Sequence, residues 1–249
     1  MKKITSGVVV FSFILLCFGA ASAQRLFKDR KFYGPVPLRS ISLSFGFIDG
    51  PEAMALTDHL DQWASQRGGY NPFGEIGTSP YMKAGFEHFL APQIFFTAAA
   101  NFSYFNLEAG GFYVSRTEPP LALDMNRKLS IYLFSLDLGL KYYMTKQDVK
   151  KLVPYFGGGF SAAVPVVDLE TELYNEGVPY SGSGESLSET SLEEGMHAEI
   201  GLIYFITNRQ SASFEARYQM AQSKFEIHDA NFDLRYKGIT LALTITRHF

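Results

Sequence analysis

LSIYLFSLDLGLKYYM, the stretch from Leu129 to Met144, places apolar side chains at every second residue, with small or polar ones between them over most of its length. A period of two is the pattern of a β-strand with two unlike faces. Tyr132 and Tyr142 bound the apolar face. At about 3.3 Å per residue and a tilt near 40°, they lie roughly 25 Å apart along a membrane normal, which is the height of the lipid-facing band of a transmembrane barrel between its aromatic girdles. The stretch therefore predicts a membrane-crossing strand.

Seven further segments show the same alternation, so the chain predicts eight strands. They span residues 40–48, 81–89, 94–106, 155–166, 196–206, 211–223 and 236–249. The connections alternate in length: residues 90–93, 145–154 and 207–210 are shorter, and residues 49–80, 107–128, 167–195 and 224–235 are longer. Short turns at one end and long loops at the other are typical of bacterial outer-membrane barrels. Because a free sheet edge has no partner in lipid, we predict a closed, all-β, eight-stranded antiparallel up-and-down transmembrane β-barrel.

A soluble sandwich or lipocalin-like barrel would place the apolar face inside and the polar face in water. Two features of the polar face disfavour it: Gly, Ala, Ser and Thr concentrate there, and its charges are few and of both signs. A narrow closed interior requires small side chains, and buried charges require partners. We therefore expect ion pairs inside the barrel between the cations Lys83, Lys141 and Arg217 and the carboxylates Glu87, Asp137, Glu199 and Glu215.

The N-terminal residues have the form of an export signal. Lys2 and Lys3 precede an apolar run from Val8 to Phe18, and Ala21-Ser22-Ala23 resembles a cleavage site. We predict a signal peptide over residues 1–23 cleaved after Ala23, a basic periplasmic extension over residues 24–39, and the barrel over residues 40–249. The single cysteine, Cys17, lies within the signal, and Leu16 before it departs from the small residue of a lipidation motif.

The composition excludes several function classes. One cysteine in 249 residues leaves no disulfide framework and no cysteine-rich zinc site. The net charge of −3 is spread over both signs and gives no basic footprint for nucleic acid. No nucleophile elbow, phosphate loop, dinucleotide fingerprint or zinc-protease motif occurs in a usable context. We therefore propose no catalytic residue, cofactor or metal ligand from motifs.

Two local patterns resemble a known family. Pro154-Tyr155-Phe156-Gly157-Gly158-Gly159-Phe160 is similar to the Pro-Tyr-x-Gly-x-Gly stretch that begins a strand in OmpA-like and OmpW-like barrels, and the chain ends on Phe249 after an alternating strand. That ending resembles the signal read by the outer-membrane insertion machinery, although Arg247 stands where an aromatic or aliphatic residue is usual. The resemblance covers about residues 40–249. It implies a small outer-membrane barrel and does not choose among structural anchors, adhesin-like proteins and small-solute channels.

The histidines raise one catalytic alternative. Asp58-His59-x-Asp61 lies in the first long loop and His228-Asp229 in the last, and the flanking strands are neighbours in a closed barrel. Outer-membrane proteases of the omptin kind activate water with such pairs at the rim, but they have ten strands. His88 and His248 lie at the periplasmic ends of their segments, where we expect interfacial side chains near the headgroups.

Two loops carry further patterns. The third long loop, residues 167–195, has eight carboxylates and no Lys or Arg, which suits either a solvated flexible loop or diffuse divalent-cation binding. Residues 52–66 of the first long loop form an amphipathic stretch with Met54, Leu56, Leu60 and Trp63 on one face. We expect a helix packed on the barrel mouth, with a lid or partner-binding surface as the alternative.

The sequence as a whole favours a non-enzymatic integral barrel in the cell outer membrane, with a structural or surface-interaction role through its long loops. Its expected partners are the lipid bilayer, lipopolysaccharide and the barrel-insertion machinery, and no nucleic acid. Charged side chains that fill an eight-stranded interior disfavour an open pore. The alternatives are a narrow channel or transporter for small or apolar solutes, and a surface hydrolase at the rim.

Overall fold

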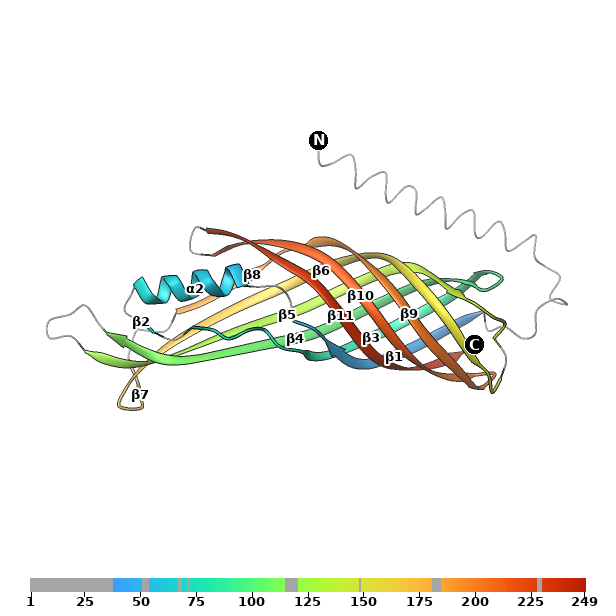
Figure 1. Ribbon diagram of the computed structural model, residues 1–249, viewed down its shortest axis with the longest axis horizontal. Helices are drawn as coiled ribbons and strands as arrows, with labels where there is room; N and C mark the ends of the chain where they lie inside the picture. The colour runs from blue at the N-terminus through green and yellow to red at the C-terminus, as the bar shows by residue number, and fades with distance from the viewer. Residues whose placement is uncertain are drawn as a thin grey trace, which may run out of the picture.

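The computed structural model describes residues 38–50, 54–66, 69–70, 72–114, 121–147, 149–180, 185–227 and 230–249. Within these residues, eight long strands form a barrel (Figure 1). They are β1 (Arg39–Ile48), β3 (Ser79–Ala91), β4 (Ile94–Val114), β5 (Ala122–Tyr143), β6 (Leu152–Asn175), β9 (Glu193–Thr207), β10 (Gln210–Ile227) and β11 (Ala230–His248). The shorter elements are α2 (Met54–Gln66), β2 (Gly69–Tyr70), β7 (Val178–Pro179) and β8 (Glu185–Thr190).

The barrel is closed by the pairing of its first and last strands. Each long strand pairs antiparallel with the next one along the chain, and β1 pairs with β11 from Ser40 opposite His248 to Ile48 opposite Thr240. The predicted up-and-down topology with eight strands is therefore confirmed. Residues 92–93, 144–151 and 208–209 connect strands at one end, here called the tight-turn end, and the longer connections lie at the other, the long-loop end.

The two faces of the barrel wall are chemically inverted relative to a soluble protein. Outward-facing apolar side chains are widely exposed: Leu136 exposes 64% of its surface and Ile245 71%. The inward-facing positions of the same strands hold buried polar groups such as Ser44, Asp137 and Thr244. A continuous exposed apolar belt of this kind is stable only in lipid. The chain is a transmembrane barrel, and the soluble alternative is excluded.

Strands β4, β5 and β6 are longer than the sequence pattern predicted, and they project beyond the barrel (Figure 1). In this projecting sheet the polarity of the faces reverses: Leu123, Met125 and Leu169 are buried on the inner face, while Asp124 and Glu170 are exposed on the outer face. Such polarity is normal for a sheet in water. The predicted long loops over residues 107–128 and 167–195 were therefore wrong in extent, because the outward apolar face on which the prediction rests ends with the membrane.

The residues expected to form a flexible acidic loop are mostly ordered strand. Residues 167–175 complete β6, β7 pairs with its end at Tyr174 and Asn175, and β8 pairs with β6 from Val166 to Thr171. On the other side of the projecting sheet, β2 pairs with β4 at Phe112 and Tyr113. The long-loop end therefore carries a sheet in the order β2-β4-β5-β6-β8. The β10–β11 hairpin extends at the same end (Figure 1).

The predicted helix is present as α2, at the long-loop end (Figure 1). Leu60 and Ala64 are buried, so this helix packs on the mouth of the barrel as expected; the side chains of Met54, Leu56 and Trp63 lie outside the described residues. No described helix is long and apolar enough to cross a membrane.

Gly159 gives a test of the close β5–β6 packing. It lies opposite Gly139, and a Cβ at Gly159 would stand 2.0 Å from the carbonyl oxygen of Leu138. Gly159→Ala is expected to lower the free energy of unfolding by about 1–3 kcal/mol, because the two backbones must separate. The measurement is urea unfolding in detergent micelles, followed by the shift between unheated and boiled protein on SDS gels.

Gly110→Ala is the matched control, since a Cβ at Gly110 of β4 would meet nothing within 4 Å. Its free energy of unfolding is expected to stay within about 0.5 kcal/mol of the wild type. Equal midpoints for the two variants would contradict the tight packing at Gly159.

Candidate functional site: the filled barrel and its helical cap

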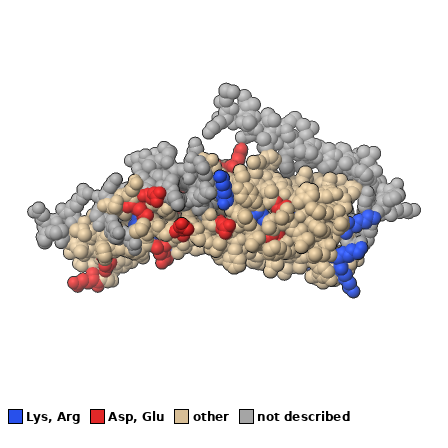
Figure 2. Space-filling view, viewed as in Figure 1, with Lys and Arg blue, Asp and Glu red and all other residues tan. Residues whose placement is uncertain are grey.

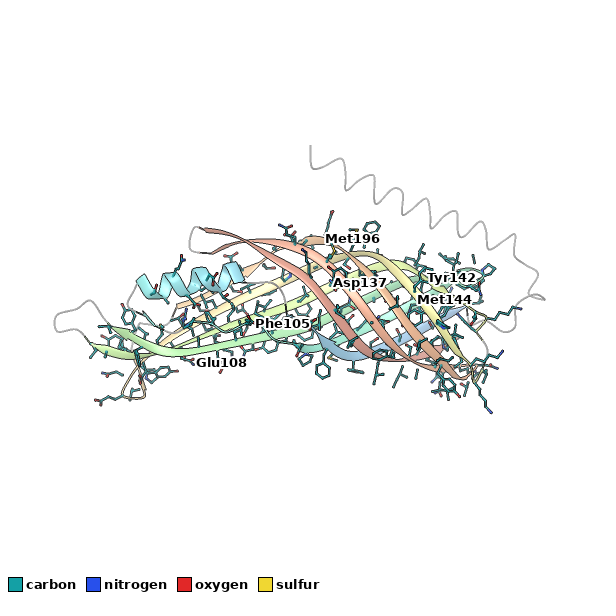
Figure 3. The ribbon with its side chains drawn as sticks, in the orientation of Figure 1. Phe105, Glu108, Asp137, Tyr142, Met144 and Met196 are labelled. Carbon is teal, nitrogen blue, oxygen red and sulfur yellow. The ribbon has the colours of Figure 1, made fainter. Side chains whose placement is uncertain are left out.

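The barrel interior is filled at three successive heights. An aromatic layer closes the tight-turn end, a charged layer occupies the middle, and an apolar layer lies beneath α2 at the long-loop end. Figure 3 labels Phe105 of the apolar layer and Asp137 of the charged layer along the barrel, with Tyr142 and Met144 near the tight-turn end. Any solute that crossed the barrel along its axis would meet all three.

Two lysines in the charged layer share one carboxylate. Lys83 of β3 pairs with Glu215 of β10 and lies 3.6 Å (Nζ to Oε2) from Glu199 of β9. Lys141 of β5 pairs with Glu87 at 2.6 Å and with Glu199 at 3.4 Å. Glu199 therefore bridges the two cations, and the ion pairs run between strands that are not neighbours in the wall.

The third cation of the layer, Arg217 of β10, pairs with Asp137 of β5 at 2.5 Å. Asn101 donates its side-chain amide to the same carboxylate at 2.5 Å, and Arg217 donates to the Asn101 side-chain oxygen at 3.3 Å. All seven charges that the sequence placed inside are thus buried and paired, and the predicted interior ion pairs are confirmed. A buried charge left without its partner is costly, so this layer fixes the relative positions of the strands that supply it.

Three tyrosines complete the charged layer. Tyr143 donates its hydroxyl to Glu87 at 3.0 Å, Tyr155 to Glu215 at 3.1 Å, and Tyr81 to Asn101 at 2.6 Å. The Lys141 ammonium also stands 4.4 Å from the centre of the Tyr155 ring. Gly201 makes this arrangement possible, because a Cβ there would lie 2.4 Å from the Tyr155 ring.

The charged layer has four carboxylates and three cations. His197 lies beside one of these carboxylates, Asp137. Its Nδ1 is 3.1 Å from the Ser161 hydroxyl and 3.9 Å from Asp137. The charged layer leaves a cavity of about 20 Å³, lined by His197, Asp137 and the ion pairs. This volume accommodates about one water molecule.

The aromatic layer contains the main correction to the histidine predictions. Tyr143, Phe95 and Phe205 are buried in this layer, and the Phe95 and Tyr143 rings meet edge to face at 5.2 Å. His248 is buried as well: its ring stacks on Phe205 at 5.3 Å and its Nε2 lies 2.8 Å from the Ser211 hydroxyl. It was expected among the headgroups, but its strand position points inward. His88, by contrast, stacks on outward-facing Phe86, in keeping with the expected interfacial position.

Arg127 of β5 fastens α2 to the barrel. Its guanidinium is buried, donates to the Leu60 carbonyl at 3.1 Å and to the Asp61 carboxylate at 2.8 Å, and lies 4.4 Å from the centre of the Phe73 ring. Asp61 in turn accepts a hydrogen bond from the Phe73 amide. This set of contacts, here called the Arg127 latch, holds the first long connection over the apolar layer.

The residues of the hydrolase alternative are only partly described. His228, Asp229 and the side chain of His59 lie outside the described residues, and Asp58 is exposed. Asp61 is engaged in the Arg127 latch. The acidic residues of the third connection are spread over β6, β8 and β9, and in the described part of the chain no three His, Cys, Asp or Glu side chains gather closely enough to hold a metal ion.

The alternating pattern did not predict the Arg127 latch, although the sequence contains a signal for it. Counting back by twos from Lys141 and Asp137 places Arg127 on the inward face of the same strand. The predicted strand begins at Leu129, because the outward apolar residues end at Tyr132. Arg127 therefore falls in a predicted loop. The three interior tyrosines were likewise not singled out, because their hydroxyl partners come from other strands.

Comparisons with known proteins found structural neighbours only: no family model and no curated protein matches the chain. The outer membrane protein OprG of Pseudomonas aeruginosa matches with a TM-score of 0.46 and 14% identity over 86% of this chain and 96% of that one. Neisserial surface protein A matches at 0.39 and 11% over 85% and 96%. Ail of Yersinia pestis, in complex with the heparin analogue sucrose octasulfate, matches at 0.35 and 12% over 85% and 99%. At such scores and identities, neither a family nor an activity is carried over to this chain.

The Arg217–Asp137 pair is open to a thermodynamic test. Arg217→Met is expected to destabilise the barrel by about 3–5 kcal/mol, because it leaves the Asp137 carboxylate buried without its cation. The double variant Arg217→Met/Asp137→Leu is expected to recover at least half of this loss, since both charges are then removed. Urea unfolding in micelles measures both, and strictly additive losses would contradict the pairing.

The Arg127 latch is open to a proteolytic test. Arg67 is the only trypsin site between residues 49 and 78. Arg127→Ala is expected to speed cleavage after Arg67 by about tenfold or more, because the loss of charge-assisted hydrogen bonds frees α2 to leave the mouth. Lys128→Ala, the adjacent residue with the opposite facing on β5, is the control and is expected to cleave at the wild-type rate. Equal rates in the two variants would show that the latch does not hold the helix.

Proposed function

We propose that this chain is a non-conducting, non-enzymatic barrel of the outer membrane that anchors the projecting sheet and α2 and presents them at the cell surface. The observation that carries the proposal is the filled interior: seven buried charges pair across the barrel and leave room for about one water molecule. The tight-turn end then faces the periplasm and the long-loop end the exterior, as in other barrels of this kind.

The energetic case against an open pore rests on the number of barriers in series. An ion entering from the long-loop end would have to displace α2, cross the buried apolar layer, break the ion pairs and pass the aromatic layer. Ion pairs between buried groups resist rearrangement, because separating them exposes each charge to a poorly solvating interior. The structure thus favours a scaffold over a conduit.

The projecting sheet offers a broad surface for recognition. Its outer face bears exposed carboxylates of β4, β5 and β6, among them Glu108, Asp124, Glu170 and Glu172. Lys128 lies between Glu108 and Glu170 in register. An acidic rim of this kind would meet anionic lipopolysaccharide through divalent cations, or a cationic extracellular partner directly. Export through the predicted signal peptide and insertion through the C-terminal strand belong to the same proposal.

A lateral route for small apolar solutes is the second candidate, and one observation favours it. Beyond Ala221, opposite Gly195, β10 pairs only with β11, and β8 pairs only with β6. In the described residues no main-chain ladder joins β8 to β10, so the wall has a seam there. Leu192, at the base of the seam, exposes 74% of its surface. Ala221, at the base of the seam, belongs to the apolar layer.

Planar-bilayer recording tests the main proposal. The wild-type barrel is expected to give no steady conductance, because its charged layer is paired and packed. Replacing Lys83, Glu215, Lys141 and Glu199 together by serine removes two cations and two carboxylates from one of the barriers in series. It is expected to admit water to the charged layer and to give brief conductance steps more often than the wild type, because the apolar and aromatic layers remain.

The control for this experiment is Lys128→Ser/Glu170→Ser, which removes a cation and a carboxylate that face outward in register. It is expected to be as silent as the wild type. A stable conductance of the wild-type barrel would contradict the scaffold proposal. Vesicles containing the silent barrel that still take up an apolar fluorescent solute, and lose this uptake in Leu192→Asp, would establish the lateral route instead.

A further inference from the structure

The tight-turn rim is basic, in contrast to the acidic long-loop end. Its exposed cationic side chains come from four places in the wall: Arg39 of β1, Arg247 of β11, Arg209 of the β9–β10 turn, and Lys146, Lys150 and Lys151 of the β5–β6 turn. Figure 2 shows Lys and Arg side chains projecting from this end and Asp and Glu side chains mostly in the other half. No described Asp or Glu side chain is exposed on this rim.

Three of these cations converge through strand register. Arg247 lies opposite Ile41 on β1, and Arg39, two residues before Ile41, is therefore its diagonal neighbour on the outward face. Diagonal neighbours on one face of an antiparallel pair lie about 7–8 Å apart. Arg209 is joined to the same place, since its carbonyl accepts the amide hydrogen of His248. We call Arg39, Arg209 and Arg247 the arginine cluster.

The height of the arginine cluster matches lipid phosphates. Arg39 and Arg247 each stand one outward position beyond an exposed isoleucine, Ile41 and Ile245, that faces lipid. One outward step on a tilted strand descends about 5 Å, which takes a side chain from the hydrocarbon edge into the headgroups. Long cationic side chains at this boundary extend toward the interface.

No described Asp or Glu side chain is exposed beside the cluster. Among the described residues, none of its three arginines is ion-paired with an Asp or Glu side chain, and the Arg247 guanidinium lies 5.9 Å from the centre of the Phe249 ring. Like charges on neighbouring strands repel. An anion held between them removes the repulsion, and a phosphate matches the forked guanidinium geometry.

We propose that the arginine cluster binds the phosphate of an anionic phospholipid in the periplasmic leaflet. In the sequence, residues 24–38 before β1 contain Arg25, Lys28, Arg30 and Lys31 against Asp29 alone, and β1 begins at Arg39. This assigns a role to Arg247, where the insertion signal usually has an apolar residue. A basic inner rim and an acidic outer rim then orient the barrel between two chemically different leaflets.

The test measures retention of phosphatidylglycerol by native mass spectrometry of the full refolded chain. Arg39→Gln/Arg247→Gln is expected to weaken phosphatidylglycerol binding about twentyfold, which corresponds to about 1.8 kcal/mol, because two guanidinium–phosphate contacts are lost. Phosphatidylcholine, which has no net charge, is expected to bind far more weakly to the wild type and to be unaffected by the substitutions.

Lys146→Gln/Lys150→Gln is the matched control, because it removes two charges of the same rim outside the arginine cluster. Its loss is expected to stay below about threefold, and a loss equal to that of the arginine variant would overturn the cluster as a site. Glycerol phosphate is expected to leave phosphatidylglycerol bound; displacement by it would show that the ligand is a soluble phosphate.

Folding of every variant is checked by the shift of the unheated band on SDS gels. If the glutamine variant does not fold, Arg39→Lys/Arg247→Lys keeps both charges and removes the forked geometry. It is expected to bind phosphatidylglycerol about threefold more weakly than the wild type, and unchanged binding would overturn the recognition of phosphate by guanidinium.

Discussion

A sheet in lipid has no solvent to satisfy the hydrogen-bonding groups at its edges, and every other feature of this molecule depends on that constraint. The β1–β11 pairing removes the last free edge within the membrane. Once the wall is closed, alternate side chains can only point into lipid or into a space about as wide as an eight-stranded barrel allows. Apolar residues therefore point outward, and the polar residues must satisfy one another inside.

The charged layer follows from this confinement. Lys83, Lys141 and Arg217 have no access to bulk water, so each is held by a carboxylate from a different strand. The pairs cross the lumen and do not follow the wall, and they therefore tie together strands that are distant around the barrel. One side-chain layer thus both stabilises the closed form and obstructs the axial route, as the proposed scaffold role requires.

Outside the membrane the same strands obey the opposite rule. Where β4, β5 and β6 leave the lipid, their outward residues become charged, and their inward residues become an apolar surface that must be covered. The helix α2, held by Arg127, provides that cover. Between β8 and β10 the sheet pairing also stops, and no main-chain ladder of the described residues closes this seam.

The sequence by itself determined what the period-two alternation encodes: eight membrane strands, their outward faces, the long-loop and tight-turn ends, the amphipathic helix at residues 52–66, and the seven charges inside. These follow from local pattern, because lipid imposes one rule along each strand. Only the tertiary structure decided which lysine meets which glutamate, that Arg127 reaches Asp61, that His248 turns inward, and how far β5 and β6 extend. Such contacts depend on register between strands and on where the membrane ends, and neither is encoded within a single segment.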